Sequence, residues 1–285
     1  MRLFKYFPAN RLPILIERLI RFSPPSAFND PFEFLPCIRS IGTPSEINEQ
    51  IQKAAKANHS DHYLSSGLSN FGVSEDAFNM CMERLLLNSM PLAMKMMEAV
   101  IPQTQKALFD SMNNNIGVLC LSERNDDLLM WAHYGDCHKG FVLEFDSESE
   151  FFNRQVGPRD SLRHLRKVNY SLKRPALSLS EANDEDIFLT KSEHWEYEAE
   201  WRMMLPLANA DKTIVVNGET ICLFEFPVEA IRSVTFGAKF SEEVSSYAMK
   251  EISMLEGYEA FEFYKAKIHP TDYEILLYPA WPASF

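Results

Sequence analysis

Apolar and polar residues alternate with a period of two in several short stretches of the chain, which is typical of β-strands. One such stretch is 262–268, where Phe261 and Phe263 alternate with charged residues. Further strands are predicted at 3–6, 118–121, 141–145, 167–171, 200–205 and 231–236. Asn217-Gly218 separates the apolar stretches 213–216 and 221–226, and an Asn-Gly pair in that place predicts a two-residue β-hairpin.

Other stretches repeat apolar residues at the spacing of an amphipathic helix, as in 12–21. The sequence TPSE at 43–46 is a capping box with proline at the first helical position, and it predicts a helix to about residue 56. Helices at 74–89, 92–100 and 102–113 follow, so that 43–115 forms an all-helical, Met-rich block. A short helix is predicted after the N-cap Ser192 and a last helix after the N-cap Ser241. The chain after residue 268 is predicted to be coil.

These elements predict one domain, 1–285, of the α+β class. Its core is a mixed, mostly antiparallel sheet, and the helical block at about 43–115 is inserted into it. Hydrophobic residues make up 46% of the chain and charged residues 24%, so a sizeable core is available.

The stretch 117–146 carries the densest group of polar side chains. A strand, a helix at 128–134 and a second strand form its frame. The end of the helix and the connection after it hold five polar residues: His133, Tyr134, Asp136, His138 and Lys139. Binding and catalytic side chains lie disproportionately on loops that a rigid scaffold positions. This connection is therefore the strongest indication of a functional site in the sequence.

Charge and cysteine content limit the classes of function. The net charge of -12 opposes general binding to nucleic-acid backbones, which needs clustered Lys and Arg. The cysteines are odd in number, five, and lack the short spacing of a zinc site, so we expect reduced thiols in the cytoplasm. The apolar stretch 85–101 is interrupted by Asn88, Pro91, Lys95 and Glu98 and predicts no membrane span.

Three stretches carry a combination of motifs: FSPPSAFNDPFE at 22–33, the region 121–141 with MWAHY at its centre, and WEYEAEWR at 195–202. Together they resemble a family of bacterial proteins, the domain of unknown function 2971. The resemblance implies a shared fold and brings no established reaction. The order of elements is also loosely similar to ADP-ribosyltransferase-like folds, in which an early strand and a glutamate on a late strand frame a nicotinamide pocket.

The first hypothesis is an enzyme that acts on a nucleotide-type substrate, by cleavage of the glycosidic bond of NAD or by ADP-ribosyl transfer. Breaking that bond builds positive charge on the sugar, which a nearby carboxylate stabilises, and Glu200 is the best candidate. His133 is the second candidate catalytic residue. The candidate ligand-binding residues are Tyr6, Ser23, Asn29, Asp30, Trp131, Tyr134, His138, Lys139, Glu198 and Arg202. A purely structural pairing of Glu200 with Arg202 on a strand face is the competing interpretation.

Two further hypotheses remain open. His133, Asp136 and His138 offer imidazole and carboxylate ligands for a metal-dependent hydrolase, although no second group of ligands is evident and no metal residue is assigned. A non-catalytic binding module would use the helical block as its partner surface. The sequence identifies no cofactor and no protein partner, and NAD would enter as a substrate. We expect 23–33, 131–139 and 195–202 to line one cleft.

Overall fold

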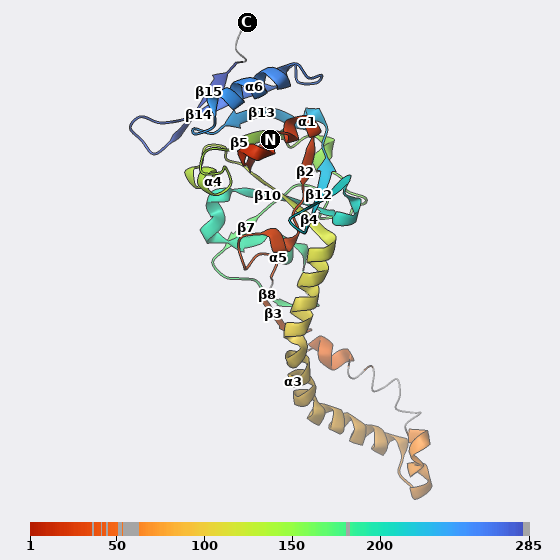
Figure 1. Cartoon of the computed structure of the whole chain (residues 1–285). Coiled ribbons are helices and arrows are strands. Elements are labelled where there is room, and N and C mark those ends of the chain that lie inside the picture. The colour runs from red at the N-terminus through yellow and green to blue at the C-terminus, as the bar shows by residue number, and fades with distance from the viewer. Residues whose placement is uncertain are drawn as a thin grey trace. The chain divides into compact units, whose positions relative to one another are not determined.

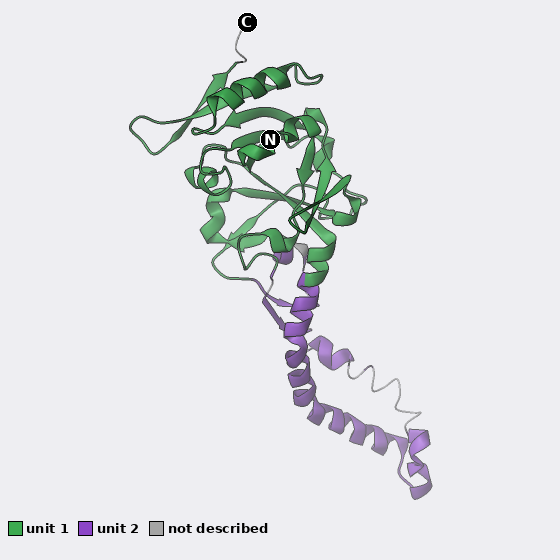
Figure 2. Cartoon of the chain, viewed as in Figure 1, with its two compact units in different colours: residues 1–34, 110–174, 188–285 green, residues 35–109, 175–187 purple. Residues whose placement is uncertain are grey.

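A computed structural model describes residues 1–35, 37–40, 42–43, 45–50, 53, 63–180 and 183–281 (Figure 1). The chain divides into two compact units (Figure 2). Unit 1 comprises Met1–Phe34, Asp110–Arg174 and Phe188–Phe285, and unit 2 comprises Leu35–Phe109 and Pro175–Ile187. Folding of 1–285 as one domain stays a prediction.

Unit 1 is built on an eight-stranded sheet with the order β15-β14-β13-β5-β1-β4-β10-β6. Its neighbouring strands are antiparallel except for β13 and β14, which are parallel. The α+β class with a mixed, mostly antiparallel sheet is therefore confirmed. In chain order the strands are β1 (Arg2–Phe7), β4 (Ile116–Ser122), β5 (Phe141–Asp146), β6 (Arg166–Lys167), β10 (Glu200–Pro206), β13 (Ile231–Phe236), β14 (Glu262–Ile268) and β15 (Ile275–Ala280).

Alternate residues of β1 pack on opposite faces of this sheet, as the period of a strand requires. Leu3 and Phe7 belong to the larger core, which α1 (Ile14–Glu17) and α6 (Glu242–Ser253) cover with apolar side chains. Phe4 and Tyr6 belong to a second cluster with Trp131 of α4 (Leu128–His133). Both faces of the central strand are thus covered, and α4 marks the face on which the candidate site lies.

Two smaller sheets complete unit 1. β11 (Lys212–Val216), β12 (Glu219–Glu225) and β2 (Leu19–Arg21) form one, and β7 (Asn169–Ser171) pairs with β9 (Thr190–Ser192) in the other. The hairpin predicted at Asn217-Gly218 is confirmed, and both residues have the positive φ that such turns need, 52° and 82°. The helix predicted over 12–21 is too long, because α1 ends at Glu17, its C-cap Arg18 has φ 53°, and β2 then pairs with β12.

Short 3-10 helices connect these elements. They are η1 (Ala9–Arg11), η2 (Pro25–Ala27), η4 (Glu150–Phe152), η5 (Glu193–Glu198), η6 (Leu207–Asn209) and η7 (Val228–Ala230). The chain after residue 268 was expected to be coil, but β15 adds an edge strand there that pairs with β14. Tertiary pairing decides this, since 275–280 carries Pro279 and gives a weak strand signal by itself.

Unit 2 contains β3 (Cys37–Ser40) paired with β8 (Ala176–Ser178), η3 (Leu68–Phe71) and most of α3 (Glu75–Asn115). α5 (Asp184–Phe188) lies at its end. The predicted capping box is confirmed, because Thr43 N–H donates to Glu46 Oε2 and Glu46 N–H donates to Thr43 Oγ1. The described part of 43–115 contains helices and turns and no strand, whereas the helix end predicted near residue 56 lies outside the described residues.

α3 is one helix where three were predicted. Pro91 and Pro102 lie inside it, and each removes a single backbone hydrogen bond without ending the helix.

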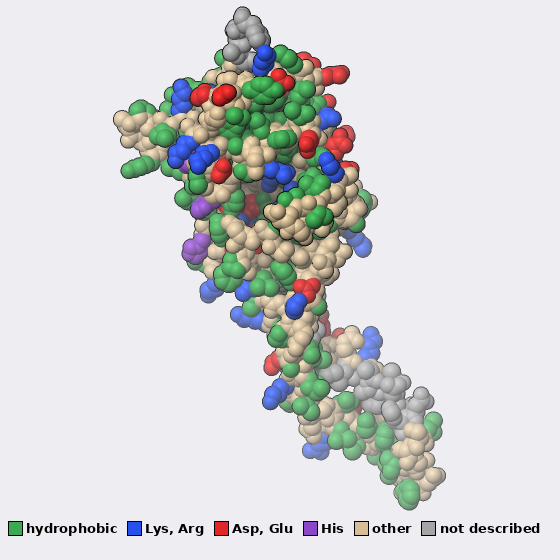
Figure 3. All heavy atoms as spheres, viewed as in Figure 1, with side chains coloured by type: hydrophobic (Ala, Val, Ile, Leu, Met, Phe, Trp, Pro, Cys, Tyr) green, Lys and Arg blue, Asp and Glu red, His purple; other side chains and the backbone are tan. Residues whose placement is uncertain are grey.

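On the face of the molecule seen in Figure 3, acidic and basic side chains are interspersed. Among the described residues, no helix is both long and apolar enough to span a lipid bilayer.

Candidate functional site

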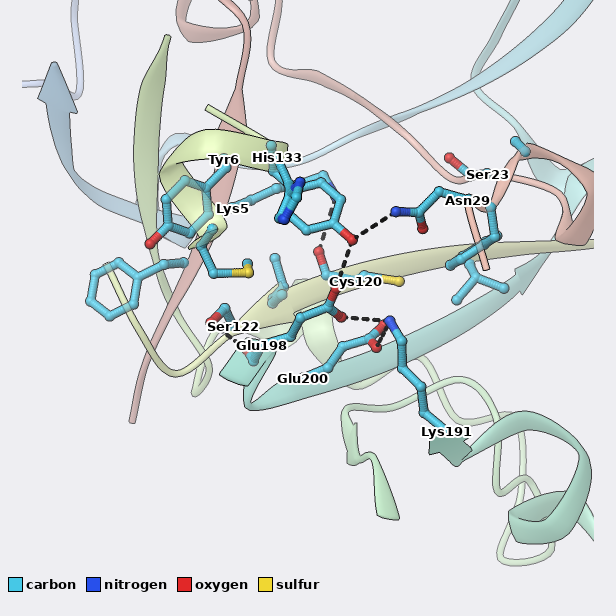
Figure 4. Close-up of a pocket in the computed structure, with 17 residues that line it drawn as sticks. Lys5, Tyr6, Ser23, Asn29, Cys120, Ser122, His133, Lys191, Glu198 and Glu200 are labelled. Atoms are coloured by element: carbon cyan, nitrogen blue, oxygen red, sulfur yellow. Dashed lines mark hydrogen bonds and ion pairs between the residues drawn. The ribbon is translucent and has the colours of Figure 1, made fainter. Parts of the chain in front are cut away.

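Unit 1 contains a pocket of about 350 Å³ (Figure 4). Its walls come from β1, the loop after β2, β4, α4, β9, and the turn from η5 into β10: Phe4, Lys5, Tyr6, Ser23, Ala27, Phe28, Asn29, Val118, Cys120, Leu121, Ser122, Met130, His133, Tyr134, Lys191, Glu198 and Glu200. The three stretches that were expected to line one cleft all contribute side chains to this pocket.

The pocket lies where the sheet is interrupted between β1 and β4. β1 pairs with β5 at every residue from Arg2 to Phe7, whereas in the described structure it pairs with β4 at one position, Phe4 with Ser122. Further along the same edge of β4, Val118 exchanges two backbone hydrogen bonds of 2.9 Å with Ser23, which lies in the loop after β2. The central sheet therefore has a gap between these two contacts.

The turn from η5 into β10 places two carboxylates in the pocket. Ser192 caps η5 as predicted, since its Oγ accepts a hydrogen bond from the N–H of His194. Ala199 then adopts a left-handed conformation, φ 43°, and β10 begins at the next residue. As a result Glu198 and Glu200 both face the pocket. Glu198 itself is not part of the extended strand, because it ends the 3-10 helix.

Five charged side chains, each no more than 5% exposed, form a network beneath the pocket: Glu33, Lys191, Glu198, Glu200 and Arg202. Lys191 Nζ lies 2.5 Å from Glu198 Oε2 and 3.0 Å from Glu200 Oε2. Arg202 donates from Nε to Glu200 Oε1 at 2.7 Å and from Nη2 to Glu200 Oε2 at 2.9 Å. Its Nη2 also donates to Glu33, and its Nη1 donates to the Phe188 carbonyl at 2.8 Å.

These surroundings separate the pKa values of the two pocket carboxylates. Burial raises the pKa of Glu198, and the charge of Glu200 adds to the increase while Lys191 opposes it. Burial acts in the same direction on Glu200, but the charges of Arg202 and Lys191 prevail and hold its pKa well below the usual range. Glu200 therefore stays ionised at neutral pH, whereas Glu198 takes up a proton more readily.

Hydrogen bonds fix the position of Glu198. Tyr134 donates its hydroxyl proton to Glu198 Oε1 at 2.6 Å and accepts from Asn29 Nδ2 at 3.3 Å. Burial raises the pKa of Tyr134, and the neighbouring Glu198 raises it further, so the phenol stays a donor. Ser122 Oγ donates to the Glu198 carbonyl at 2.6 Å. Both the side chain and the backbone of Glu198 are thus held in place.

The sequence-predicted site residues fall into two groups. Those that line the pocket are Tyr6, Ser23, Asn29, His133, Tyr134, Glu198 and Glu200. Of the others, Arg202 is fully buried within the ionic network behind Glu200, and Lys139 is exposed and does not line the pocket. Asp30 closes its own turn, accepting a hydrogen bond from the N–H of Phe32 at 2.9 Å.

Trp131 and His138 lie in the protein beside the pocket wall. The Trp131 side chain is fully buried, and its Nε1 donates to the Asn125 carbonyl at 2.9 Å. Its ring packs edge-on against Tyr6 and is stacked with His138, with ring centroids 5.3 and 6.2 Å apart. Burial lowers the pKa of His138, and the charge of Lys239 contributes. These contacts assign both rings to packing in the described structure.

The proposed metal ligands do not form a cluster. His133 lines the pocket, while Asp136 is exposed in a tight turn with φ 49° and His138 stacks on Trp131. Within the described ranges, no group of three or more His, Cys, Asp and Glu side chains is arranged to hold a metal ion.

Several residues of the site were not identified from the sequence. Lys5, Cys120, Ser122 and Lys191 line the pocket, and Glu33 completes the ionic network. Glu33 is the last residue of the stretch 22–33 that carries the family resemblance, so the sequence could have indicated it as a site residue. Lys191 precedes the cap at Ser192 and carries no local pattern, since its role depends on carboxylates brought together by folding.

In comparisons with known proteins, one family model matches part of the chain. The family model described as "Protein of unknown function (DUF2971)" matches residues 130–203. This segment includes Tyr134, Lys191, Glu198, Glu200 and Arg202. Searches of curated proteins and of solved structures found no match. The match over residues 130–203 supports the resemblance to this family that the sequence shows.

Proposed function

We propose that the pocket binds a nucleotide-type small molecule and cleaves its glycosidic bond, by hydrolysis of NAD or by transfer of ADP-ribose from it. One observation carries the proposal: the buried carboxylates of Glu198 and Glu200 face a pocket of about 350 Å³ and are held there by Lys191. Buried ionic networks are costly in free energy, and perturbed carboxylates in a cleft are candidates for catalysis. The volume falls within the range of small-molecule sites.

The chemistry of the bond favours this arrangement. When the bond between nicotinamide and ribose breaks, its electron pair leaves with the base and positive charge develops on the sugar. Fixed negative charge beside the sugar stabilises that state. We assign the contact with the sugar to Glu198, whose Oε1 is oriented by Tyr134. Glu200, with both oxygens held by Arg202, supplies constant charge behind it.

Hydrolysis then balances in a simple way. The oxygen of water forms the new bond to the anomeric carbon, and nicotinamide leaves as the neutral base. One proton from the water passes to Glu198 and on to solvent, so NAD and water give ADP-ribose, nicotinamide and a proton. In transfer, a nucleophilic group of an acceptor takes the place of water.

Aromatic side chains on the pocket wall supply a surface for a flat ring. Phe4, Tyr6, Phe28 and Tyr134 all line the cavity, and such rings stack on nucleobases and nicotinamide. The similarity of element order to ADP-ribosyltransferase-like folds supports the same choice by analogy alone. A reducing compartment such as the cytoplasm is part of the proposal and agrees with the five free cysteines.

The test is the variant Glu198→Gln, which keeps the size of the side chain and removes its charge. We expect nicotinamide release from NAD to fall by at least ~100-fold, the effect of losing a preorganised electrostatic contact in a transition state. Glu196→Gln is the matched control, because that glutamate is exposed on the same 3-10 helix. Unchanged turnover in Glu198→Gln would refute the assignment. A wild-type protein that neither releases nicotinamide nor is stabilised by NAD or ADP-ribose would refute the function.

A second candidate function is a binding module that uses the helical block. α3 exposes several large apolar side chains, among them Met80 at 68%, Leu92 at 63% and Met96 at 65%. In the described part of α3, Met112 is the residue classed as buried. An exposed apolar helix suits a protein partner. The Glu198→Gln variant separates the two functions, since partner binding through α3 would survive it.

A further inference from the structure

The gap in the sheet between β1 and β4 exposes backbone groups inside the pocket. Residues two apart on a strand direct their backbone N–H and C=O groups to the same edge. Val118 directs both groups to Ser23, so Cys120 directs both of its own into the gap. The Cys120 carbonyl accepts a hydrogen bond from Lys5 Nζ at 2.9 Å. In the part of the chain that the structure describes, β1 pairs with β4 at Phe4 and Ser122 alone, so Cys120 has no pairing partner on that side.

Lys5 brings a cation to the same place. Lys191 and Arg202 each contact carboxylates directly, whereas no carboxylate of the described residues lies within ion-pairing distance of Lys5. The Cys120 carbonyl accepts a hydrogen bond from one of the three N–H groups of the Lys5 ammonium. Burial lowers the pKa of Lys5, and the negative charge of Glu200 offsets only part of this decrease.

We infer that this gap is a subsite for a phosphate group, which accepts hydrogen bonds from Lys5 Nζ and from the Cys120 N–H. A phosphate suits both donors because Lys5 already contacts Cys120, whose backbone N–H is directed into the gap, so one tetrahedral anion reaches the two. The inference rests on the proposed function for the rest of the ligand. It narrows the substrate class to nucleotides, in which a phosphate lies one sugar away from the bond that Glu198 and Glu200 face, and disfavours free nucleosides.

The experiment measures binding of inorganic pyrophosphate, ADP-ribose and nicotinamide riboside by calorimetry to the full chain and to Lys5→Met. Methionine replaces the aliphatic part of the lysine side chain and removes the charged amino group. Lys139→Met is the control, because Lys139 is exposed and does not line the pocket. We expect Lys5→Met to bind pyrophosphate and ADP-ribose ~10- to 100-fold more weakly, as for the loss of one charged hydrogen bond, and to bind the riboside as the wild type does.

Equal binding of pyrophosphate by Lys5→Met and wild type would overturn the subsite, as would weak binding of all three ligands by the wild type. If Lys5→Met does not fold, a wild-type protein that binds ADP-ribose no more tightly than the riboside overturns it instead. Failure of the proposed function would give a different result: pyrophosphate binding would depend on Lys5, but nicotinamide would be released neither from NAD nor from nicotinamide riboside. Cleavage of the riboside without any Lys5-dependent pyrophosphate binding would leave the function standing and remove the subsite.

Discussion

Arg202 provides the most direct test of the ionic network, through the substitution Arg202→Met. The guanidinium donates to both oxygens of Glu200, to Glu33 and to the Phe188 carbonyl, and its side chain is fully buried. Methionine fills similar volume but leaves two buried carboxylates without that partner. Removal of one member of a buried ion pair costs about 3–5 kcal/mol. We expect the midpoint of thermal unfolding to fall by about 6–20 °C.

The loss should depend on pH. In the wild type, the depressed pKa of Glu200 stabilises the folded state at pH values above the unfolded pKa near 4.5. This contribution is lost as the pH falls towards the folded pKa. In the variant, burial without Arg202 raises the pKa of Glu33 and of Glu200, so that protonation relieves the uncompensated charge. The difference in unfolding free energy between the two proteins should therefore shrink between pH 7.5 and pH 5.

Urea unfolding followed by tryptophan fluorescence measures this difference. All four tryptophans, at 131, 195, 201 and 281, lie in unit 1, so the signal reports the unit that contains the network. The control is Arg232→Met, since Arg232 pairs with Asp146 at 58% side-chain exposure and such pairs contribute at most about 1 kcal/mol. An Arg202→Met variant as stable as the control, or one with the same deficit at both pH values, would refute this account of the network.

Two further predictions concern residues around the pocket. Tyr134→Phe removes the hydrogen bond that lowers the pKa of Glu198, so the acidic limb of the pH profile for nicotinamide release should move to higher pH. The loss of this bond should cost about 1 kcal/mol of stability. An unchanged profile would show that Tyr134 does not set the pKa of Glu198. Asp127 is the N-cap of α4, and its Oδ1 accepts hydrogen bonds from the N–H groups of Leu129 and Met130. Asp127→Ala should therefore lower the free energy of unfolding, measured with denaturant, by about 1 kcal/mol. Asp126→Ala, at an exposed position, should cost much less, and equal losses would contradict the capping role.

Local signals in the sequence predicted local structure well. Asn217-Gly218 specified the hairpin, and Ser192 and Ser241 marked helix starts, because each acts through hydrogen bonds or dihedral angles within a few residues. Pairings between distant segments carry no such signal. β2 and β15 form because β12 and β14 are available as partners, and the sequence around either strand predicted helix or coil instead.

The candidate site shows the same division. Glu198, Glu200 and Tyr134 were identified from polar and aromatic clusters in single stretches. Lys5 and Lys191 were missed, since a lone lysine in a strand gives no pattern until folding places it beside the Cys120 carbonyl or between two carboxylates. Arg202 was chosen for a ligand phosphate, and its burial in the network was not visible without the fold.

The central position of β1 in the sheet affects how the chain folds. Lys5 and Cys120, which meet across the gap, are 115 positions apart, and β5 lies still later in the chain. At synthesis rates of 5–20 residues per second, β1 waits roughly 6–23 s on the ribosome before β4 is made. Pairings of such long range also form slowly once the chain is complete. The apolar residues of β1 are therefore exposed during synthesis, so chaperones that cover short hydrophobic segments should raise the yield of folded protein.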